Sequence, residues 1–337
     1  MNRAAPRTMA SETADPIGAL LAHARVGVLD GALATELERR GADLRDPLWS
    51  SKTLIEAPDL IRAVHLDYFR AGADVATTAT YQATFAGFAR RGIAAGEAAG
   101  LMRRAVAIAR PAREEFWQDP AARAGRVRPL VAASVGPYGA MLGDGSEYRG
   151  GYGLDRAALR AFHRPRVQLL ARSGADLLAF ETIPSLTEAL ALADTLAELP
   201  ETVAWMSFCC RDAARTAEGQ DIAAAAAALD GCPGIVAIGV NCTAPRLLPA
   251  LLERMAGATG KPLIAYPNSG ERYDADAKTW SGRADGSRFA HDAAIWHAAG
   301  ARLIGGCCRT GPAQIRALRA WADSQCPSAA PPRRHRG

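Results

Sequence analysis

Short apolar runs alternate with longer helix-like segments along almost the whole of this 337-residue chain. Eight of the runs have the length and composition of buried strands: 26–29, 74–77, 130–134, 177–180, 203–208, 235–240, 263–266 and 302–305. Continuous apolar strands separated by helices are typical of a parallel sheet that is covered on both faces. Eight such units predict an α/β fold of the TIM type, a (β/α)₈ barrel, whose active sites form where the strands end.

The segments between these runs have the patterns of helices. We expect helices over 58–71, 97–116, 155–173, 186–198, 220–229, 246–258, 287–299 and 312–323. An open doubly wound sheet is the alternative, but no strand is followed by the Gly-x-Gly-x-x-Gly turn of its commonest dinucleotide site. We therefore expect one barrel domain over residues 16–323, with a disordered N-terminal segment at 1–15 and a disordered basic tail at 324–337.

The formal net charge of +5 is modest and lies partly in the basic tail, so it does not indicate nucleic-acid binding. The chain has no run of about 18 or more uncharged apolar residues, and its start lacks the pattern of a secretory signal. We therefore expect a cytoplasmic protein, a monomer or small homo-oligomer, with no membrane partner and no nucleic-acid partner.

Polar residues and thiols follow four of the expected strands. They are Asp30 after the first, Glu181 after the fourth, Asn241 and Cys242 after the sixth, and Cys307 and Cys308 after the eighth. The chain has seven cysteines, an odd number that argues against a disulfide framework. Three thiolates converging from two strand ends would supply a Cys₃ set for Zn²⁺ and leave a fourth position open for a substrate. The preceding Gly305 and Gly306 would permit the tight backbone that adjacent ligands need.

Other interpretations of the same residues stay open at this point. Cysteine is often simply a small buried apolar residue, and an adjacent pair can also be redox-active. A rival pair, Cys209 and Cys210, follows the fifth strand without flanking glycines. Asp30 and Glu181 can cap helices or pair with arginines, or their carboxylates can bind an ammonium group. Ser134, after the third strand, offers a hydroxyl donor or belongs to an ordinary turn.

Longer stretches around these positions resemble the zinc-dependent homocysteine S-methyltransferases, most closely the bacterial type that uses S-methylmethionine. The similarity runs from about Leu29 to Leu318 and includes LDGALATELERRG (29–41), HLDYFRAGAD (65–74), YQAT (81–84), SVGPYGAMLGDGSEYRGGY (134–152), FHRPRV (162–167), YPNSGERYDA (266–275) and ARLIGGCCRT (301–310).

The resemblance implies a (β/α)₈ barrel with one Zn²⁺ held by Cys242, Cys307 and Cys308, and with the homocysteine sulfur as the exchangeable ligand. It places Glu181 on the amino group of homocysteine and Asp30 in the lining of the same pocket. Asn241 fits the family's Gly-x-Asn-Cys pattern as a supporting residue. We include Ser134 among the expected substrate-binding residues.

The reaction that the resemblance implies is methyl transfer to L-homocysteine from S-methylmethionine, or secondarily from S-adenosylmethionine, to give methionine. Aromatic faces suit a sulfonium cation, which makes Trp49, Tyr81, Phe85 and Tyr138 candidates for the donor site, with ordinary packing as the alternative. Betaine or another onium compound as donor, and selenohomocysteine as acceptor, are alternatives within the same chemistry. A different class of function is a catalytically inactive zinc or thiol sensor.

Overall fold

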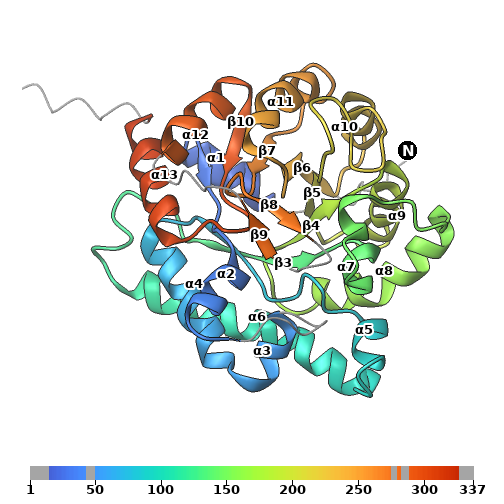
Figure 1. The fold of residues 1–337 in the computed structure, drawn as a ribbon. Helices are drawn as coiled ribbons and strands as arrows, with labels where there is room; N and C mark the ends of the chain where they lie inside the picture. Colours follow the sequence, from blue (N-terminus) through green and yellow to red (C-terminus); the bar gives the residue numbers. More distant parts are fainter. Residues whose placement is uncertain (1–14, 43–49, 275–278, 282–287, 326–337) are drawn as a thin grey trace, which may run out of the picture.

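Eight parallel strands form a barrel in the computed structural model, which describes residues 15–42, 50–274, 279–281 and 288–325 (Figure 1). The strands are β1 (Gly27–Val28), β2 (Val75–Thr77), β3 (Leu130–Val135), β4 (Leu177–Ile183), β5 (Ala204–Phe208), β6 (Ile235–Asn241), β7 (Leu263–Tyr266) and β10 (Ala301–Ile304). They are ordered β1-β10-β7-β6-β5-β4-β3-β2, and a parallel bridge from Leu29 to Val75 joins the two outer strands. The predicted barrel is confirmed, including all eight strands.

The predicted helices are also confirmed, and each end lies within two residues of its expected position. They are α4 (Pro58–Ala71), α6 (Ala95–Gln118), α8 (Arg156–Ala171), α9 (Leu186–Ala197), α10 (Ile222–Asp230), α11 (Leu248–Ala256), α12 (Phe289–Ala298) and α13 (Pro312–Ser324). Helix α4 ends as the sequence indicates, because Gly72 adopts the left-handed conformation, with φ +112°, that stops a helix before the next strand.

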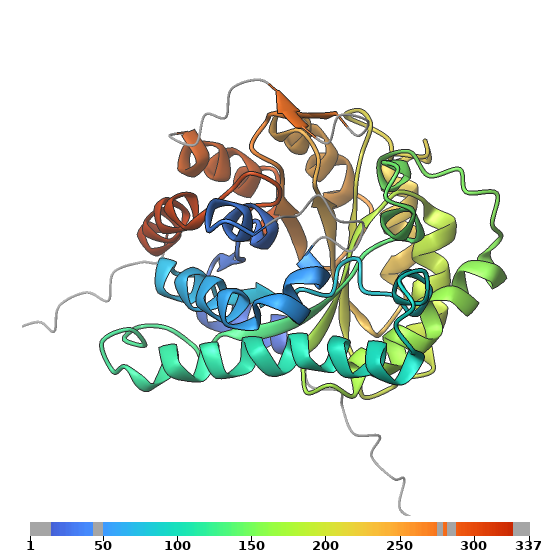
Figure 2. The same cartoon turned by 60° about the horizontal axis from the view of Figure 1, so that its bottom comes forward.

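Several short elements were not predicted. They are the helices α1 (Pro16–His23), α2 (Leu33–Arg39), α3 (Ser50–Glu56), α5 (Phe85–Ala89) and α7 (Tyr138–Leu142), the 3₁₀ turns η1 (Ser146–Tyr148) and η2 (Pro245–Leu247), and the antiparallel hairpin of β8 (Arg272–Asp274) and β9 (Thr279–Ser281). Seen from two directions, the hairpin lies over the end of the barrel at which β7 ends (Figures 1 and 2).

The expected disordered segments fall almost entirely outside the described residues, which exclude 1–14 and 326–337. At the first described position the Asp15 side chain accepts a hydrogen bond from Ile17 N, at 3.0 Å, and so caps α1. Ile17 and Leu20 of α1 pack against the residues that fill the barrel interior. No helix in the described part of the chain is long and apolar enough to cross a membrane.

Buried side chains fill the barrel interior, so that the space for a ligand lies beyond the strand ends. Trp205 and Tyr266 are the largest members of this interior cluster, which also contains Leu29, Ile264 and Leu303. The Trp205 indole donates a hydrogen bond to the Tyr266 hydroxyl at 3.0 Å. A second and larger core lies between the strands and the surrounding helices. This arrangement directs the polar residues that follow the strands into one pocket.

Candidate active site

Three cysteine sulfurs meet at the ends of β6 and β10. The Cys242 Sγ lies 2.8 Å from the Cys307 Sγ and 3.4 Å from the Cys308 Sγ, and the latter two sulfurs are 3.9 Å apart. Within the described residues, these three side chains form the one cluster of ligand-type groups compact enough to hold a metal ion. The structure therefore brings together the three cysteines that the sequence singled out.

The donor set fits a zinc ion with small adjustments. Zn–S bonds near 2.3 Å in a tetrahedral site place sulfurs roughly 3.8 Å apart, close to two of the three separations here. Hydrogen bonds from the Cys307 and Cys308 thiols hold the pKa of Cys242 well below its usual range. The hydrogen bonds to Cys242 raise the pKa values of Cys307 and Cys308, so the negative charge of the cluster lies on the Cys242 sulfur.

The backbone around the cysteines is tightly constrained. Cys242 has a positive φ of +47°, which is uncommon for a residue with a side chain. A Cβ on Gly305 would lie 2.5 Å from the Cβ of Leu29, and a Cβ on Gly306 would collide with the Thr310 side chain. The amide of Gly306 donates to the carbonyl of Asp30 at 3.0 Å. The glycines therefore permit a close approach between the start and the end of the barrel.

Glu181 lies near the end of β4, two residues before Ile183, and is 8% exposed. One carboxylate oxygen accepts a hydrogen bond from the Ser134 hydroxyl, and the other accepts one from the Tyr266 hydroxyl at 3.2 Å. Burial raises the pKa of Glu181 to about 7 despite these hydrogen bonds, and the charge on Cys242 raises it further. Ser134 and Tyr266 thus fix the orientation of a buried carboxylate beside the sulfur cluster.

Asp30, at the end of β1, is held by the end of β2. Its carboxylate accepts a hydrogen bond from the Thr77 amide at 2.8 Å and lies 3.3 Å from the Thr77 hydroxyl oxygen. Burial raises the pKa of Asp30 well above its usual range, and the nearby charge of Glu181 contributes to the rise. A buried carboxylate whose pKa is raised by a neighbouring carboxylate favours a cationic group close to both.

Asn241 joins the ends of β4 and β6. Its side-chain carbonyl accepts from the Thr182 amide at 2.7 Å, and its amide donates to the Thr182 hydroxyl at 2.8 Å. Thr182 has a positive φ of +61°, a strained conformation that this pair of hydrogen bonds stabilises. The Asn241 amide nitrogen also lies 4.0 Å from the Cys307 sulfur. Asn241 therefore holds the strand end that presents Glu181.

Of the aromatic residues expected around a donor, Tyr81 packs against Gly136 at the end of β3. The charge on Cys242 contributes to raising the pKa of Tyr81, although burial is the larger cause. Tyr138 packs instead against the rings of Tyr152 and Phe162, with ring centres 5.2 and 4.9 Å away. Phe85 packs against the outer core, and Trp49 lies outside the described residues.

The rival pair that follows β5 does not join the sulfur cluster. The Cys209 thiol is buried and donates to the carbonyl oxygens of Glu147, at 3.1 Å, and Thr182, at 3.5 Å. Burial raises the pKa values of both Cys209 and Cys210, which keeps these thiols protonated. Cys209 thus connects the turn η1 to the end of β4 through hydrogen bonds to their backbone.

Tyr148 and Tyr266 are site residues that the sequence analysis missed. The Tyr148 hydroxyl lies 3.6 Å from the Cys242 sulfur, and Tyr266 contacts Glu181 as described above. The stretch 137–154 that contains Tyr148 is rich in Gly and Tyr and has no helical or strand period. The GSEY sequence at 145–148 is the one local signal, but a pattern without a period gives no direction for a side chain.

A buried polar network supports the start of this stretch. The Glu188 carboxylate accepts from the Tyr138 amide at 2.6 Å and contacts His163 Nε2 at 2.8 Å, and both side chains are fully buried. Arg166 reaches the carbonyl of Gly136 and His163 Nδ1. His163 is therefore a core residue, and it positions α7 through Glu188.

Comparison with known proteins gives consistent matches over most of the chain. The family model described as homocysteine S-methyltransferase matches residues 27–322. A homocysteine S-methyltransferase of Bacillus subtilis, YbgG, is 53% identical over 88% of this chain and 94% of its own. The homocysteine S-methyltransferase of Escherichia coli is 51% identical over 91% of this chain and 98% of its own. The metallated form of the homocysteine methyltransferase MmuM of Escherichia coli has a similar fold, with a TM-score of 0.82 and 49% identity over 91% of this chain and 99% of that one.

Proposed function

Because the chain belongs to the homocysteine S-methyltransferase family, we propose that it transfers a methyl group from a sulfonium compound to a zinc-bound homocysteine sulfur and so produces methionine. The observation that carries this proposal is the Cys₃ cluster beside the buried carboxylate of Glu181. The three cysteines suit a metal ion that binds thiolates, and the Glu181 carboxylate suits an ammonium group. Homocysteine carries both a thiol and an ammonium group.

Cys242, Cys307 and Cys308 would hold the zinc ion. A neutral set of ligands would leave less electron density on the bound homocysteine sulfur. Bound zinc would keep the homocysteine sulfur deprotonated at neutral pH, where a free thiol with a pKa near 8.5 is mostly protonated. Three protein thiolates already outweigh the charge of the ion. The added electron density keeps a fourth sulfur nucleophilic. The existence of a metallated form of the Escherichia coli relative supports the binding of a metal ion by this chain.

The carboxylates would bind and orient homocysteine. Glu181, fixed by Ser134 and Tyr266, would accept the substrate ammonium group, and Asp30 would contribute negative charge from the opposite wall. Asn241 would keep the end of β4 in place. An ammonium group held between buried carboxylates leaves the thiol end of the substrate to reach the cysteines.

The donor would deliver its methyl group in line with the homocysteine sulfur. The new S–CH₃ bond forms while the C–S bond of the sulfonium breaks, and the bonding pair stays on the donor, which leaves as a neutral thioether. A negative and a positive sulfur are thereby both neutralised, so exclusion of water favours the step and no general base is needed at the methyl. Tyr148 is an aromatic residue placed beside the cluster. S-methylmethionine is the proposed first donor and S-adenosylmethionine the second.

A donor panel tests this proposal. The purified protein, loaded with zinc, is incubated with L-homocysteine and separately with S-methylmethionine, S-adenosylmethionine and betaine, and methionine is measured. We expect the fastest turnover with S-methylmethionine. Preference for betaine would overturn the sulfonium assignment, and zinc binding without turnover of any donor would instead favour a zinc or thiol sensor.

We also propose that the protein lies in the cytoplasm. Reducing conditions there would keep the three thiols free.

Homocysteine binding should weaken as the pH falls below about 7. The pKa of Glu181 is raised to about 7, so its ionised form, which pairs with an ammonium group, predominates above that pH. We expect the KM for homocysteine to rise toward roughly tenfold per pH unit on the acid side. The measurement is KM between about pH 8 and about pH 6, with zinc content determined at each pH because zinc ligands also titrate. Equal pH profiles in the wild type and in Glu181→Gln would contradict this role.

Adding one methyl group at Gly306 should loosen the zinc ion without removing a ligand. In Gly306→Ala the new Cβ would collide with Thr310, whose hydroxyl donates to the Cys307 carbonyl at 2.6 Å, and the loop that carries Cys307 and Cys308 must move. We expect zinc affinity to fall by roughly ten- to a hundredfold, as when partners that orient ligands are lost. Competition with a chromogenic chelator measures it.

Gly231→Ala is the matched control for this substitution. Gly231 ends α10 with φ −75°, and a Cβ there meets no heavy atom within 4 Å. Its zinc affinity should equal that of the wild type. The explanation based on close packing fails if Gly306→Ala also retains zinc as tightly as the wild type.

A further inference from the structure

The loop after β3 carries a further buried carboxylate, in addition to Glu181 and Asp30. It belongs to Glu147 in the 3₁₀ turn η1, whose side chain is buried with the residue 9% exposed. The next residue, Tyr148, contacts the Cys242 sulfur at 3.6 Å. Burial raises the pKa of Glu147, and the charge at Cys242 contributes to the rise.

The Glu147 carboxylate differs from the other two in its partners. Its Oε2 atom is buried and has no hydrogen-bond partner within the described residues, whereas both oxygens of Glu181 accept hydroxyl hydrogen bonds. Asp30 likewise accepts from Thr77. A buried and unpartnered carboxylate oxygen is unfavourable in the free protein and becomes favourable when a cation reaches it.

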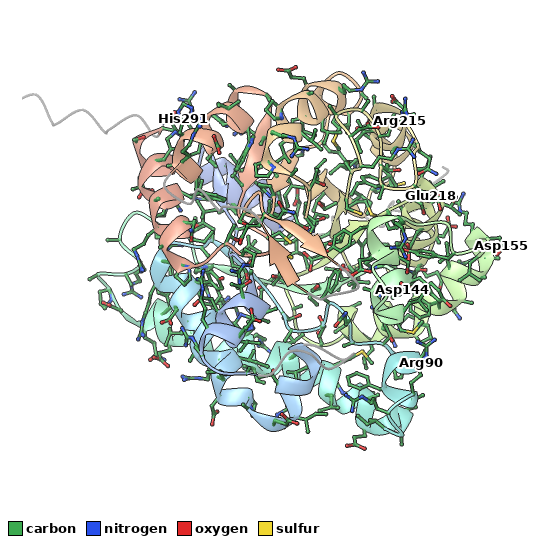
Figure 3. All side chains as sticks on the ribbon, viewed as in Figure 1. Arg90, Asp144, Asp155, Arg215, Glu218 and His291 are labelled. Atoms are coloured by element: carbon green, nitrogen blue, oxygen red, sulfur yellow. The ribbon has the colours of Figure 1, made fainter. Side chains whose placement is uncertain are left out.

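Several contacts fix the loop in this position. A Cβ on Gly139 of α7 would lie 2.5 Å from the Glu147 amide nitrogen, so a glycine there allows η1 to pack directly on α7. The Glu147 carbonyl accepts the hydrogen bond from Cys209, and the Gly151 amide donates to Glu218 at 2.7 Å. Glu218 and Asp144 lie on the same side of the molecule (Figure 3). These contacts therefore hold η1, and with it the unpartnered Oε2 atom of Glu147, in a fixed position.

In the proposed reaction the donor carries a net positive charge, because it has a sulfonium and an ammonium group and one carboxylate, whereas homocysteine has one ammonium group and one carboxylate. Glu181 and Asp30 would already serve the ammonium group of homocysteine. We infer that Glu147 is a donor-binding residue, whose carboxylate pairs with positive charge on the sulfonium donor while Tyr148 and Tyr81 line the same wall. The inference rests on the proposed function. It assigns electrostatic selection of the donor to the loop after β3, and it explains why Cys209, although not a metal ligand, is buried against that loop.

The test is Glu147→Gln, which keeps the shape of the side chain and removes its charge. Binding of S-methylmethionine to the zinc-loaded protein is measured by calorimetry, and KM values are measured for donor and homocysteine. We expect donor affinity to fall by roughly tenfold or more and the donor KM to rise in parallel, since charge-assisted contacts have about this strength. Zinc content and the KM for homocysteine should stay unchanged.

Asp144→Asn is the matched control, because it removes a negative charge from the same loop at an exposed position. It should leave donor binding unchanged. If Glu147→Gln does not fold, as judged by thermal unfolding, Glu147→Asp takes its place: it keeps the charge but retracts it, and an intermediate loss of donor affinity is expected.

Unchanged donor affinity in Glu147→Gln, or a weakened affinity for homocysteine alone, would overturn the inference. Loss of zinc would also overturn it, because Glu147 would then support the metal cluster. The proposed function fails differently: a wild-type protein that binds S-methylmethionine through Glu147 but forms no methionine would leave the inference standing and refute the transfer reaction. A wild-type protein that binds no sulfonium compound would refute both.

Discussion

Replacing Cys307 or Cys308 with alanine is expected to abolish zinc retention and methyl transfer together. Each sulfur lies within 4 Å of the other two members of the cluster, and a Cys₃ set that loses one thiolate loses both a bond and the charge that holds the ion. We expect zinc affinity to fall by more than about a hundredfold, because losing partners that merely orient ligands already costs ten- to a hundredfold. Metal analysis after dialysis measures retention, and methionine formation measures transfer.

Cys232→Ala controls for the general loss of a thiol. Cys232 lies in the turn between α10 and β6, at the opposite end of β6 from Cys242. This variant should retain zinc and activity. Full zinc occupancy in Cys307→Ala or Cys308→Ala would contradict the assignment of the ligands, and loss of zinc in Cys232→Ala would show that the assay reports stability rather than coordination.

Replacing Glu181 with glutamine should weaken homocysteine binding while zinc stays bound. The amide keeps the shape of the carboxylate and can accept the Ser134 or Tyr266 hydroxyl, but it carries no charge for the substrate ammonium group. A lost charge-assisted hydrogen bond of about 1.5–3 kcal/mol predicts a KM for homocysteine raised by roughly ten- to a hundredfold. Steady-state kinetics at saturating donor measure this effect, and metal analysis confirms the zinc content.

Glu253→Gln is the control for Glu181→Gln, since Glu253 lies exposed on α11. It should leave the KM for homocysteine unchanged. If Glu181→Gln lost its zinc instead, Glu181 would support the metal rather than the substrate. If it kept both zinc and the wild-type KM, the ammonium group of homocysteine would have to bind elsewhere.

The main elements of the barrel could be predicted because they carry their own periodic signals. Strands such as β6 and β7 are continuous apolar runs, and helices such as α4 end at a glycine that stops them. In a parallel barrel all strand ends face one way, so the list of residues after the strands is already a list of candidates for the site. This rule predicts from the sequence alone that Cys242 and Cys307 lie close together.

The remaining parts of the site depend on tertiary contacts that leave no local pattern. Tyr148 reaches the cluster because η1 packs on α7 at Gly139, which a Gly-rich stretch does not reveal. The positive φ at Thr182 is stabilised by Asn241 from a strand 59 positions away in sequence. Tyr138 was a reasonable candidate as an aromatic at a strand end, but its ring packs toward Phe162 because its backbone amide is held by Glu188.

The most direct test of the central claim is the metal dependence and stoichiometry of methionine formation from S-methylmethionine and L-homocysteine. The protein is stripped with a chelator, assayed, reconstituted with Zn²⁺ and assayed again. We expect no methionine from the stripped protein and, after zinc is restored, two methionines for each homocysteine consumed, because both the methylated acceptor and the demethylated donor are methionine. Turnover that survives complete removal of the metal, or zinc-loaded protein that leaves homocysteine unconsumed, would contradict this claim.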